Sequence, residues 1–183
     1  SLKEDDLLLG MGSFKPSIIS LVPTQLKRIV DVDKKPHPDL RCVFLGGGPI
    51  DELIIEKALQ HCWKLYIVYG STETSSMVTM LKPLDIPGRL NCAGKPISGN
   101  RLLIKDAEGL ELKRNTEGRI YIISKSVMKR YLNTPGRILS TDEYMSDDIG
   151  FIDNEGFLFV TGRFDDIIVS GGENINCSTV DET

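Results

Sequence analysis

The sequence predicts an α/β fold in which a parallel sheet with helical crossovers is followed by a small antiparallel β subdomain. In the first half, short apolar runs alternate with segments of helical periodicity, which is typical of parallel strands joined by helices. From about residue 80 onward, Pro and Gly become frequent, and short apolar runs are separated by AEG, NTEG and NEG. Such turn sequences are typical of antiparallel hairpins.

The first half contains two strand-helix units in succession. The run SIISLV predicts a strand, and PTQLKRIV predicts a helix because Pro23 suits a first helical turn and Leu26, Ile29 and Val30 share one face. The run LRCVFL predicts the second strand, GGGP ends it, and IDELIIEKALQHC predicts the second helix before the strand LYIVY. In the second half, we expect strands at RLLIKD, RIYIIS, IGFID and FLFVTG.

These elements predict three segments along the chain. Residues 1–97 form an α/β portion that carries the strand-end loops, and residues 98–162 form the antiparallel subdomain. Residues 163–183 contain a hinge and the start of a further domain. Because the chain begins at Ser1 without a methionine and stops where a helix would begin, we expect it to be a piece of a longer protein.

Composition and charge argue against several classes of partner. The 183 residues have a net charge of -4 with acidic and basic residues interspersed, so neither nucleic acid nor a membrane surface is expected as a partner. No apolar run approaches the ~18 residues that span a bilayer. The four cysteines are far apart in sequence and form no C-x-x-C pair, which predicts reduced, mostly buried thiols in a cytoplasmic protein.

Two glycine- and hydroxyl-rich loops follow predicted parallel strands. The loops are LGGGP at residues 45–49 and YGSTE at residues 69–73, and ligands of open parallel sheets bind beyond the carboxyl ends of the strands. Glycines allow close backbone approach, hydroxyls can bind phosphate oxygens, Glu73 suits a Mg²⁺ ion, and Tyr69 could stack on a base. The alternative is purely structural, because glycines form tight turns and Ser/Thr runs cap helices.

A long C-terminal stretch adds acidic pairs, an arginine and a second glycine pair. Together, YGSTE, SDDIG and GRFDDIIVSGGENI resemble, in this order, the motifs of the adenylate-forming superfamily of acyl- and aryl-CoA synthetases, adenylation domains and luciferases. The resemblance covers nearly the whole chain from about Pro16 and implies the rear part of such an enzyme's N-terminal domain. Within the superfamily, LGGGP, AGKP and SGGENI are most similar to the o-succinylbenzoate:CoA ligases of menaquinone biosynthesis.

The resemblance implies a binding site for the adenine base. Tyr69 would stack on adenine, and Gly70 belongs to the same motif. The backbone beside the base would be that of Gly46, Gly47 and Gly48.

The resemblance also implies roles for the polar residues of the motifs. Thr72 would hold the α-phosphate or the acyl-adenylate, and Glu73 would bind Mg²⁺. Asp148 would bind the ribose hydroxyls with the help of Arg163, whereas without the motif a surface ion pair would be the favoured interpretation of these two residues. Asp165 would be the hinge about which a C-terminal domain rotates.

The activity implied is that of an ATP-dependent acid:CoA ligase, which converts acid, ATP and CoA to acyl-CoA, AMP and pyrophosphate through an acyl-adenylate. Its small-molecule partners would be a carboxylic acid, ATP and CoA, with Mg²⁺ as cofactor; self-association stays open. Alternatives are another acyl- or aryl-CoA synthetase, a peptide-synthetase adenylation domain that uses a carrier-protein thiol, or a non-catalytic nucleotide-binding relative.

The sequence departs from the family pattern at two positions and covers only part of it. Asp147 stands where a glycine is usual, which places a second carboxylate beside Asp148, and Cys177 stands where a proline is usual. The family's phosphate loop and catalytic lysine have no counterpart within this sequence. The isolated chain is therefore expected to be inactive.

Overall fold

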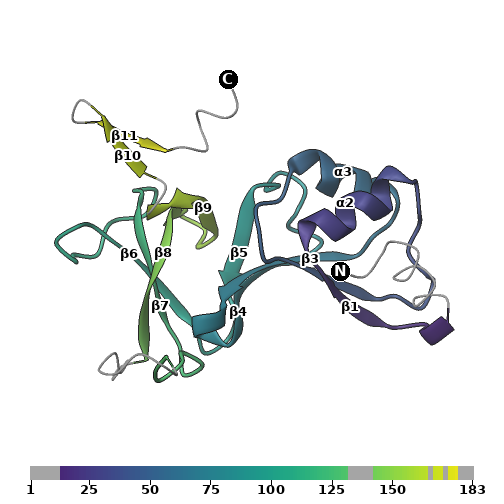
Figure 1. Cartoon of the computed structure of the whole chain (residues 1–183), viewed down its shortest axis with the longest axis horizontal. Coiled ribbons are helices and arrows are strands. Elements are labelled where there is room, and N and C mark those ends of the chain that lie inside the picture. Colours follow the sequence, from purple (N-terminus) through teal and green to yellow (C-terminus); the bar gives the residue numbers. More distant parts are fainter. Residues whose placement is uncertain (1–12, 132–141, 165–166, 171–172, 177–183) are drawn as a thin grey trace. The chain divides into compact units, whose positions relative to one another are not determined.

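The computed structural model describes residues 13–131, 142–164, 167–170 and 173–176, and the chain forms two compact units (Figure 1). Unit 1 comprises Ser1–Gly70 and Met80–Gly94, and unit 2 comprises Ser71–Thr79 and Lys95–Thr183. Strands β4 (Ser76–Leu81) and β5 (Cys92–Pro96) contain residues of both units. The chain therefore passes between the units within regular strands.

Unit 1 contains the predicted parallel strands. Strands β1 (Ile18–Leu21), β2 (Cys42–Leu45) and β3 (Leu65–Ser71) are neighbours in that order, and both pairings are parallel. Helices α2 (Pro23–Asp31) and α3 (Glu52–Gln60) are the crossovers, and Figure 1 shows both on one side of these strands. The predicted parallel sheet with helical crossovers is confirmed.

The helices of unit 1 begin and pack as their sequences predict. Pro23 opens α2, and the buried face of that helix includes Leu26, Ile29 and Val30. The Asp51 carboxylate caps α3 by accepting a hydrogen bond from the Leu53 N–H at 2.8 Å. Apolar side chains at helical spacing thus exclude water from the helix-sheet contact, which is the main stabilisation of short helices.

The expected burial of the cysteines is right for one residue and wrong for another. Cys92 is buried, and Cys42 is half-buried. Cys62 is exposed because α3 ends at Gln60, so Cys62 no longer follows the helical periodicity and instead adopts a positive φ of 64°. Cys177 lies outside the described residues.

Unit 2 is built on the predicted antiparallel strands. Strands β6 (Arg101–Lys105), β7 (Gly118–Ile123), β8 (Glu143–Ile152) and β9 (Leu158–Arg163) are neighbours in that order, and each pair is antiparallel. A separate antiparallel hairpin joins β10 (Ile167–Ser170) and β11 (Glu173–Asn176). Strand β8 starts earlier than the predicted strand IGFID, so the SDDIG motif lies within a strand.

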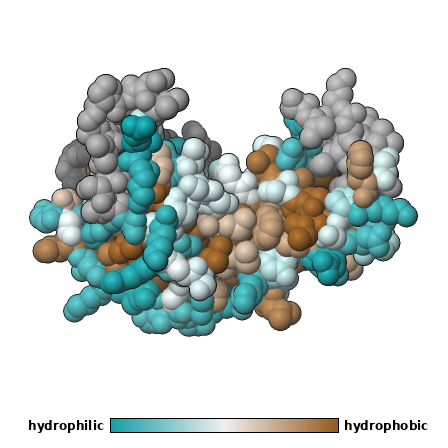
Figure 2. All heavy atoms as spheres, turned by 90° about the horizontal axis from the view of Figure 1, so that it is seen from below, coloured by the Kyte–Doolittle hydropathy of each residue, from teal (hydrophilic) through white to brown (hydrophobic). Residues whose placement is uncertain are grey.

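Hydrophilic and apolar residues are interspersed on the face of the molecule shown in Figure 2. The most exposed large apolar side chain described is that of Leu84, at 95% exposure. Among the described residues, no helix is both long and apolar enough to cross a membrane.

The pairing of β8 with β9 predicts that Gly150→Ala destabilises the protein. A methyl group at Gly150 would overlap the backbone carbonyl oxygen of Phe159, and backbone cannot move aside as a flexible side chain can. We expect a loss of about 1–3 kcal/mol in the free energy of unfolding, as for other overpacked sites, measured by denaturant titration.

Gly48→Ala is the control for this prediction, because a methyl group at Gly48 meets nothing within 4 Å. It should change the free energy of unfolding by less than ~1 kcal/mol. Equal unfolding free energies for Gly150→Ala and the unmodified protein would contradict the observed approach of β8 to β9.

Candidate active site

The glycine triplet follows β2 in unit 1, and its three positions differ. A side chain at Gly46 would overlap the carbonyl oxygen of Val68 in β3, and Gly47 has a φ of +84°, which favours glycine. Gly48 has open space around its Cα and no positive φ. The close approach of β3 therefore explains Gly46, and the left-handed backbone explains Gly47. Only Gly48 is left without a structural reason to be glycine.

Tyr69 and Gly70 lie at the end of β3, next to the triplet. In the parallel register, Leu45 of β2 is opposite Ile67 of β3, and Gly46 approaches Val68, which precedes Tyr69 in the chain. Tyr69 is half-buried, and Gly70 is exposed. Unit 1 thus brings the glycine triplet and the first two residues of the YGSTE motif, Tyr69 and Gly70, to one edge of its sheet.

Thr72 and Glu73 form a short 3₁₀ turn, η1 (Thr72–Thr74), which belongs to unit 2. The fully buried Thr74 holds this turn, because its Oγ1 accepts from the Ser71 N–H at 3.0 Å and lies 2.8 Å from the carbonyl oxygen of Ser76. Thr72 is exposed. Of the two threonines in this turn, Thr74 therefore has a structural role, whereas Thr72 is accessible.

The Glu73 carboxylate is half-buried and is bound by tyrosine hydroxyls. Tyr131 donates to Glu73 Oε1 at 3.1 Å, and the Tyr144 side chain also interacts with the carboxylate and lowers its pKa. Burial alone would raise the pKa of Glu73, but hydrogen bonds, including one from its own backbone N–H, hold it below its usual value. Burial and the neighbouring Glu73 charge raise the pKa of Tyr144 to about 12. At neutral pH, Glu73 is therefore ionised and Tyr144 keeps its proton.

Asp148 and Arg163 lie directly opposite each other in β8 and β9. Side chains at opposed positions of an antiparallel pair emerge on the same face, within reach of a common ligand. The buried Ser146 supports this position: its Oγ donates to the Ile120 carbonyl at 2.9 Å and accepts from the Asp148 N–H at 3.2 Å. The two residues that the motifs select are thus brought together.

Asp147, the departure from the family pattern, has its own partner. Its Oδ1 lies 2.6 Å from Arg119 Nη2, and Arg119 Nε donates to the Ser146 carbonyl at 2.7 Å. The Arg119 guanidinium also lies 4.5 Å from the ring centroid of Phe164. The extra carboxylate is therefore neutralised by an ion pair with β7, 28 residues away in sequence.

The predicted site residues are divided between the two units. Gly46, Gly47, Gly48, Tyr69 and Gly70 belong to unit 1. Thr72, Glu73, Asp148 and Arg163 belong to unit 2. The predicted hinge residue, Asp165, lies outside the described residues.

Sequence reasoning missed three residues: Arg119, Tyr131 and Tyr144. Arg119 and Tyr131 lie outside every motif, and Tyr144 only opens the acidic stretch. Tyr131 and Glu73 are 58 positions apart. Such contacts follow from the pairing of strands and leave no local pattern in the sequence, so only the fold reveals them.

The donor set around Glu73 fits a magnesium ion that is shared with a nucleotide. In the part of the chain that the structure describes, no three His, Cys, Asp or Glu side chains cluster as a metal site. Mg²⁺ commonly takes only one or two protein carboxylates and completes its shell with phosphate oxygens and water. The ionised Glu73 carboxylate can supply one such ligand.

Comparison with known proteins gives matches that agree with these motifs. The 2-succinylbenzoate–CoA ligase of Bacillus pumilus is 35% identical over 175 residues, which are 93% of this chain and 36% of that protein. An o-succinylbenzoate CoA synthetase from Bacillus subtilis, solved with the acyl-adenylate OSB-AMP, is 31% identical with a TM-score of 0.89, covering 96% of this chain and 37% of that one. The structure of the same enzyme with ATP and magnesium is also 31% identical, with a TM-score of 0.87, and the match covers 95% of this chain and 37% of that one.

These matches cover nearly the whole of this chain but only part of each relative. The chain spans about a third of the length of the curated relatives it matches. A family described as AMP-binding enzyme matches residues 2–132, which is more than half of the chain. The chain belongs to the family of AMP-binding enzymes.

Proposed function

We propose that the protein is an ATP-dependent acid:CoA ligase that acts on o-succinylbenzoate. The observation that carries this proposal is the placement of Asp148 opposite Arg163 in a unit that also holds the ionised Glu73. A nucleotide needs partners for its ribose and for its phosphates, and these residues have the required chemistry. The relatives named 2-succinylbenzoate–CoA ligase support the choice of acid.

The proposed reaction has two steps. In the first, a carboxylate oxygen of the acid attacks the α-phosphorus of ATP, the bond to the bridging oxygen breaks, and pyrophosphate leaves the acyl-adenylate. In the second, the CoA thiolate attacks the acyl carbon and AMP leaves, which forms the thioester. Neither step requires a covalent bond to the protein, so the task of the chain is positioning and charge stabilisation.

Each residue of the site has a part in that task. Asp148 accepts hydrogen bonds from the ribose hydroxyls, and Arg163, on the same face, adds donors. The exposed Thr72 hydroxyl donates to the α-phosphate. Magnesium, when bound, supplies positive charge that offsets the charge of the phosphate oxygens, and Glu73 is its protein ligand.

The adenine base occupies the strand-end edge of unit 1. Tyr69 stacks on the base, and the backbone of Gly46, Gly47 and Gly48 lies beside it, with Gly70 in the same motif. The open space at Gly48 supports this placement, because the base needs a surface free of side chains.

The segmental division also belongs to the proposal. Residues 1–97 carry the adenine loops, residues 98–162 form the antiparallel subdomain, and residues 163–183 begin a C-terminal domain with Asp165 as its hinge. A cytoplasmic location is proposed with it, because the substrates of such a ligase are small soluble metabolites.

An assay with a panel of acids tests the function. With the protein at its full natural length, we expect exchange of labelled pyrophosphate into ATP and thioester formation with CoA to be fastest with o-succinylbenzoate, compared with benzoate, fatty acids and amino acids. Amino-acid activation followed by transfer to a carrier-protein thiol would instead identify an adenylation domain. ATP binding without turnover of any acid would identify a non-catalytic relative.

The ribose contact predicts a contrast between two adjacent aspartates. Asp148→Ala removes a charge-assisted pair of hydrogen bonds, about 1.5–3 kcal/mol, so kcat/KM for ATP should fall roughly 10- to 150-fold with acid selectivity unchanged. Asp147→Ala should lower kcat/KM for ATP far less, because the Asp147 carboxylate pairs with Arg119 rather than with a ligand. Steady-state kinetics checks both, and equal losses would mean that the wrong aspartate is assigned to the ribose.

The adenine contact predicts a contrast between two glycines. Gly48→Ala adds a methyl group where the base is proposed to lie, so ATP binding should weaken while the midpoint of thermal unfolding stays unchanged. Gly46→Ala should lower that midpoint, because the methyl group would overlap the Val68 carbonyl oxygen. Calorimetry of binding and of unfolding separates the two effects. Unaltered ATP affinity of Gly48→Ala would reject this site for adenine.

A further inference from the structure

The turn that carries Glu73 is fastened to one segment of unit 2 by several hydrogen bonds. The Met128 N–H donates to the Glu73 carbonyl oxygen at 2.7 Å, and Ser75 Oγ donates to the Ser126 carbonyl oxygen at 2.8 Å. The same segment then supplies Tyr131, whose hydroxyl lies 3.1 Å from Glu73 Oε1. Both the backbone and the side chain of Glu73 are therefore held by residues more than 50 positions away in sequence.

A second tyrosine reaches the same carboxylate from a different element. Tyr144 lies in β8, four residues before Asp148, and its side chain interacts with the Glu73 carboxylate: it lowers the pKa of Glu73, whose charge in turn raises the pKa of Tyr144. Tyr144 is half-buried, and so is the carboxylate. Two hydroxyls from two segments thus restrict the orientation of a side chain that has three rotatable bonds.

The chemistry of these donors matters as much as their number. A hydroxyl orients a carboxylate without cancelling its charge, whereas a lysine or arginine would pair with it and compete with a bound cation. Glu73 consequently keeps its negative charge in a defined position. That is the state in which a single protein carboxylate can act as a ligand of Mg²⁺.

We propose that Tyr131 and Tyr144 are positioning residues that orient the Glu73 carboxylate for the magnesium ion of bound Mg·ATP. The inference rests on the proposed function, in which Glu73 is the metal ligand. The inference goes beyond that function because it assigns a role to two further residues, which act through Glu73. Without these hydroxyls, the Glu73 side chain would lose its conformational freedom only when Mg·ATP binds. This loss of entropy would weaken Mg·ATP binding.

The tyrosines can be tested by removing only their hydroxyl groups. Tyr131→Phe and Tyr144→Phe should each weaken ATP binding in excess Mg²⁺ by about 3- to 10-fold, the effect of one hydrogen bond. ATP binding in EDTA and the midpoint of thermal unfolding should stay unchanged. Titration calorimetry of the protein at its full natural length measures both affinities without requiring turnover.

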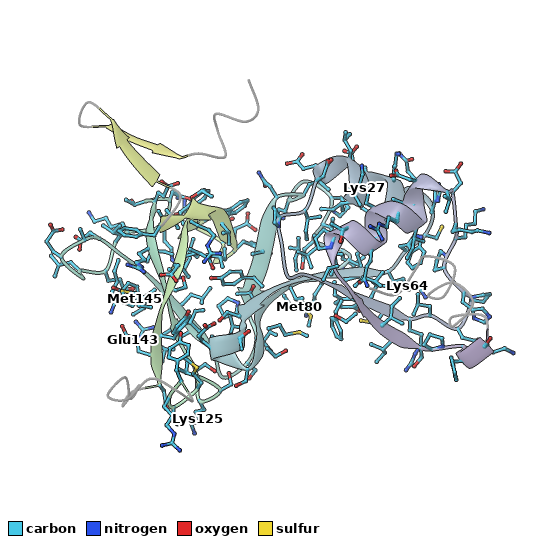
Figure 3. The ribbon with its side chains drawn as sticks, in the orientation of Figure 1. Lys27, Lys64, Met80, Lys125, Glu143 and Met145 are labelled. Carbon is cyan, nitrogen blue, oxygen red and sulfur yellow. The ribbon has the colours of Figure 1, made fainter. Side chains whose placement is uncertain are left out.

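Tyr121→Phe is the matched control, because it removes a hydroxyl of the same sheet that has no contact with Glu73. The Tyr121 hydroxyl lies 3.0 Å from the sulfur of Met145, a residue of β8 that is labelled in Figure 3. This variant should bind ATP like the unmodified protein with and without Mg²⁺. An equal loss in Tyr121→Phe and in the two tyrosine variants would overturn the proposal.

A double-mutant cycle with Glu73→Gln separates this inference from the proposed function. If the tyrosines act through Glu73, their substitution should have no further effect on Mg·ATP affinity once Glu73→Gln is present, whereas additive losses would overturn the proposal. If Glu73→Gln alone leaves the Mg²⁺ dependence unchanged, the proposed metal role of Glu73 fails, and the inference fails with it.

Two further outcomes concern the tyrosines alone. If Glu73→Gln abolishes the Mg²⁺ dependence but both tyrosine variants behave like Tyr121→Phe, the inference is wrong and the proposed function stands. If Tyr131→Phe or Tyr144→Phe weakens ATP binding equally in Mg²⁺ and in EDTA, the hydroxyl serves the fold rather than the metal, and the inference is likewise wrong.

Discussion

The hydrogen bonds that join the η1 turn and the following Ser75 to residues 126–131 are the constraint on which the candidate site of unit 2 depends. The turn contains only three residues and cannot define its own position. Its placement comes from the Met128 N–H, the Ser126 carbonyl and the Tyr131 hydroxyl, all of which follow β7. Because β7 pairs with β8, the same sheet that carries Asp148 also determines where Glu73 lies.

Strand β8 connects the parts of that site. It supplies Tyr144 to Glu73, Ser146 to the backbone of β7, and Asp148 opposite Arg163. The strand is irregular, with register shifts against both β7 and β9, and such bulges commonly re-aim side chains beside functional sites. A polar motif can therefore occupy the middle of a sheet because Ser146 and Arg119 satisfy its backbone and its second carboxylate.

Local features of the sequence predicted the fold. The features that could not be predicted depend on tertiary contacts. Helical spacing identified the buried face of α2, and turn sequences identified the hairpins, because both signals lie within a few residues. The resemblance identified Asp148 and Arg163, which the fold places together. Periodicity could not reveal that Cys62 lies beyond α3, nor that the hydroxyls of Tyr131 and Tyr144 meet at Glu73.

Two carboxylates of unit 2, Asp147 and Glu73, bind distant partners of opposite kinds. Asp147 receives a guanidinium, which cancels its charge and joins it to β7. Glu73 receives hydroxyls, and the raised pKa of Tyr144, about 12, shows that this donor keeps its proton beside an ionised acid. An ion pair suits a carboxylate with a structural role, since its charge is no longer available to a ligand. Neutral donors leave the charge of a carboxylate available to a cation. The tyrosine that binds Glu73 and the arginine that pairs with Asp147 therefore support the proposed metal role of Glu73 and a structural role for Asp147.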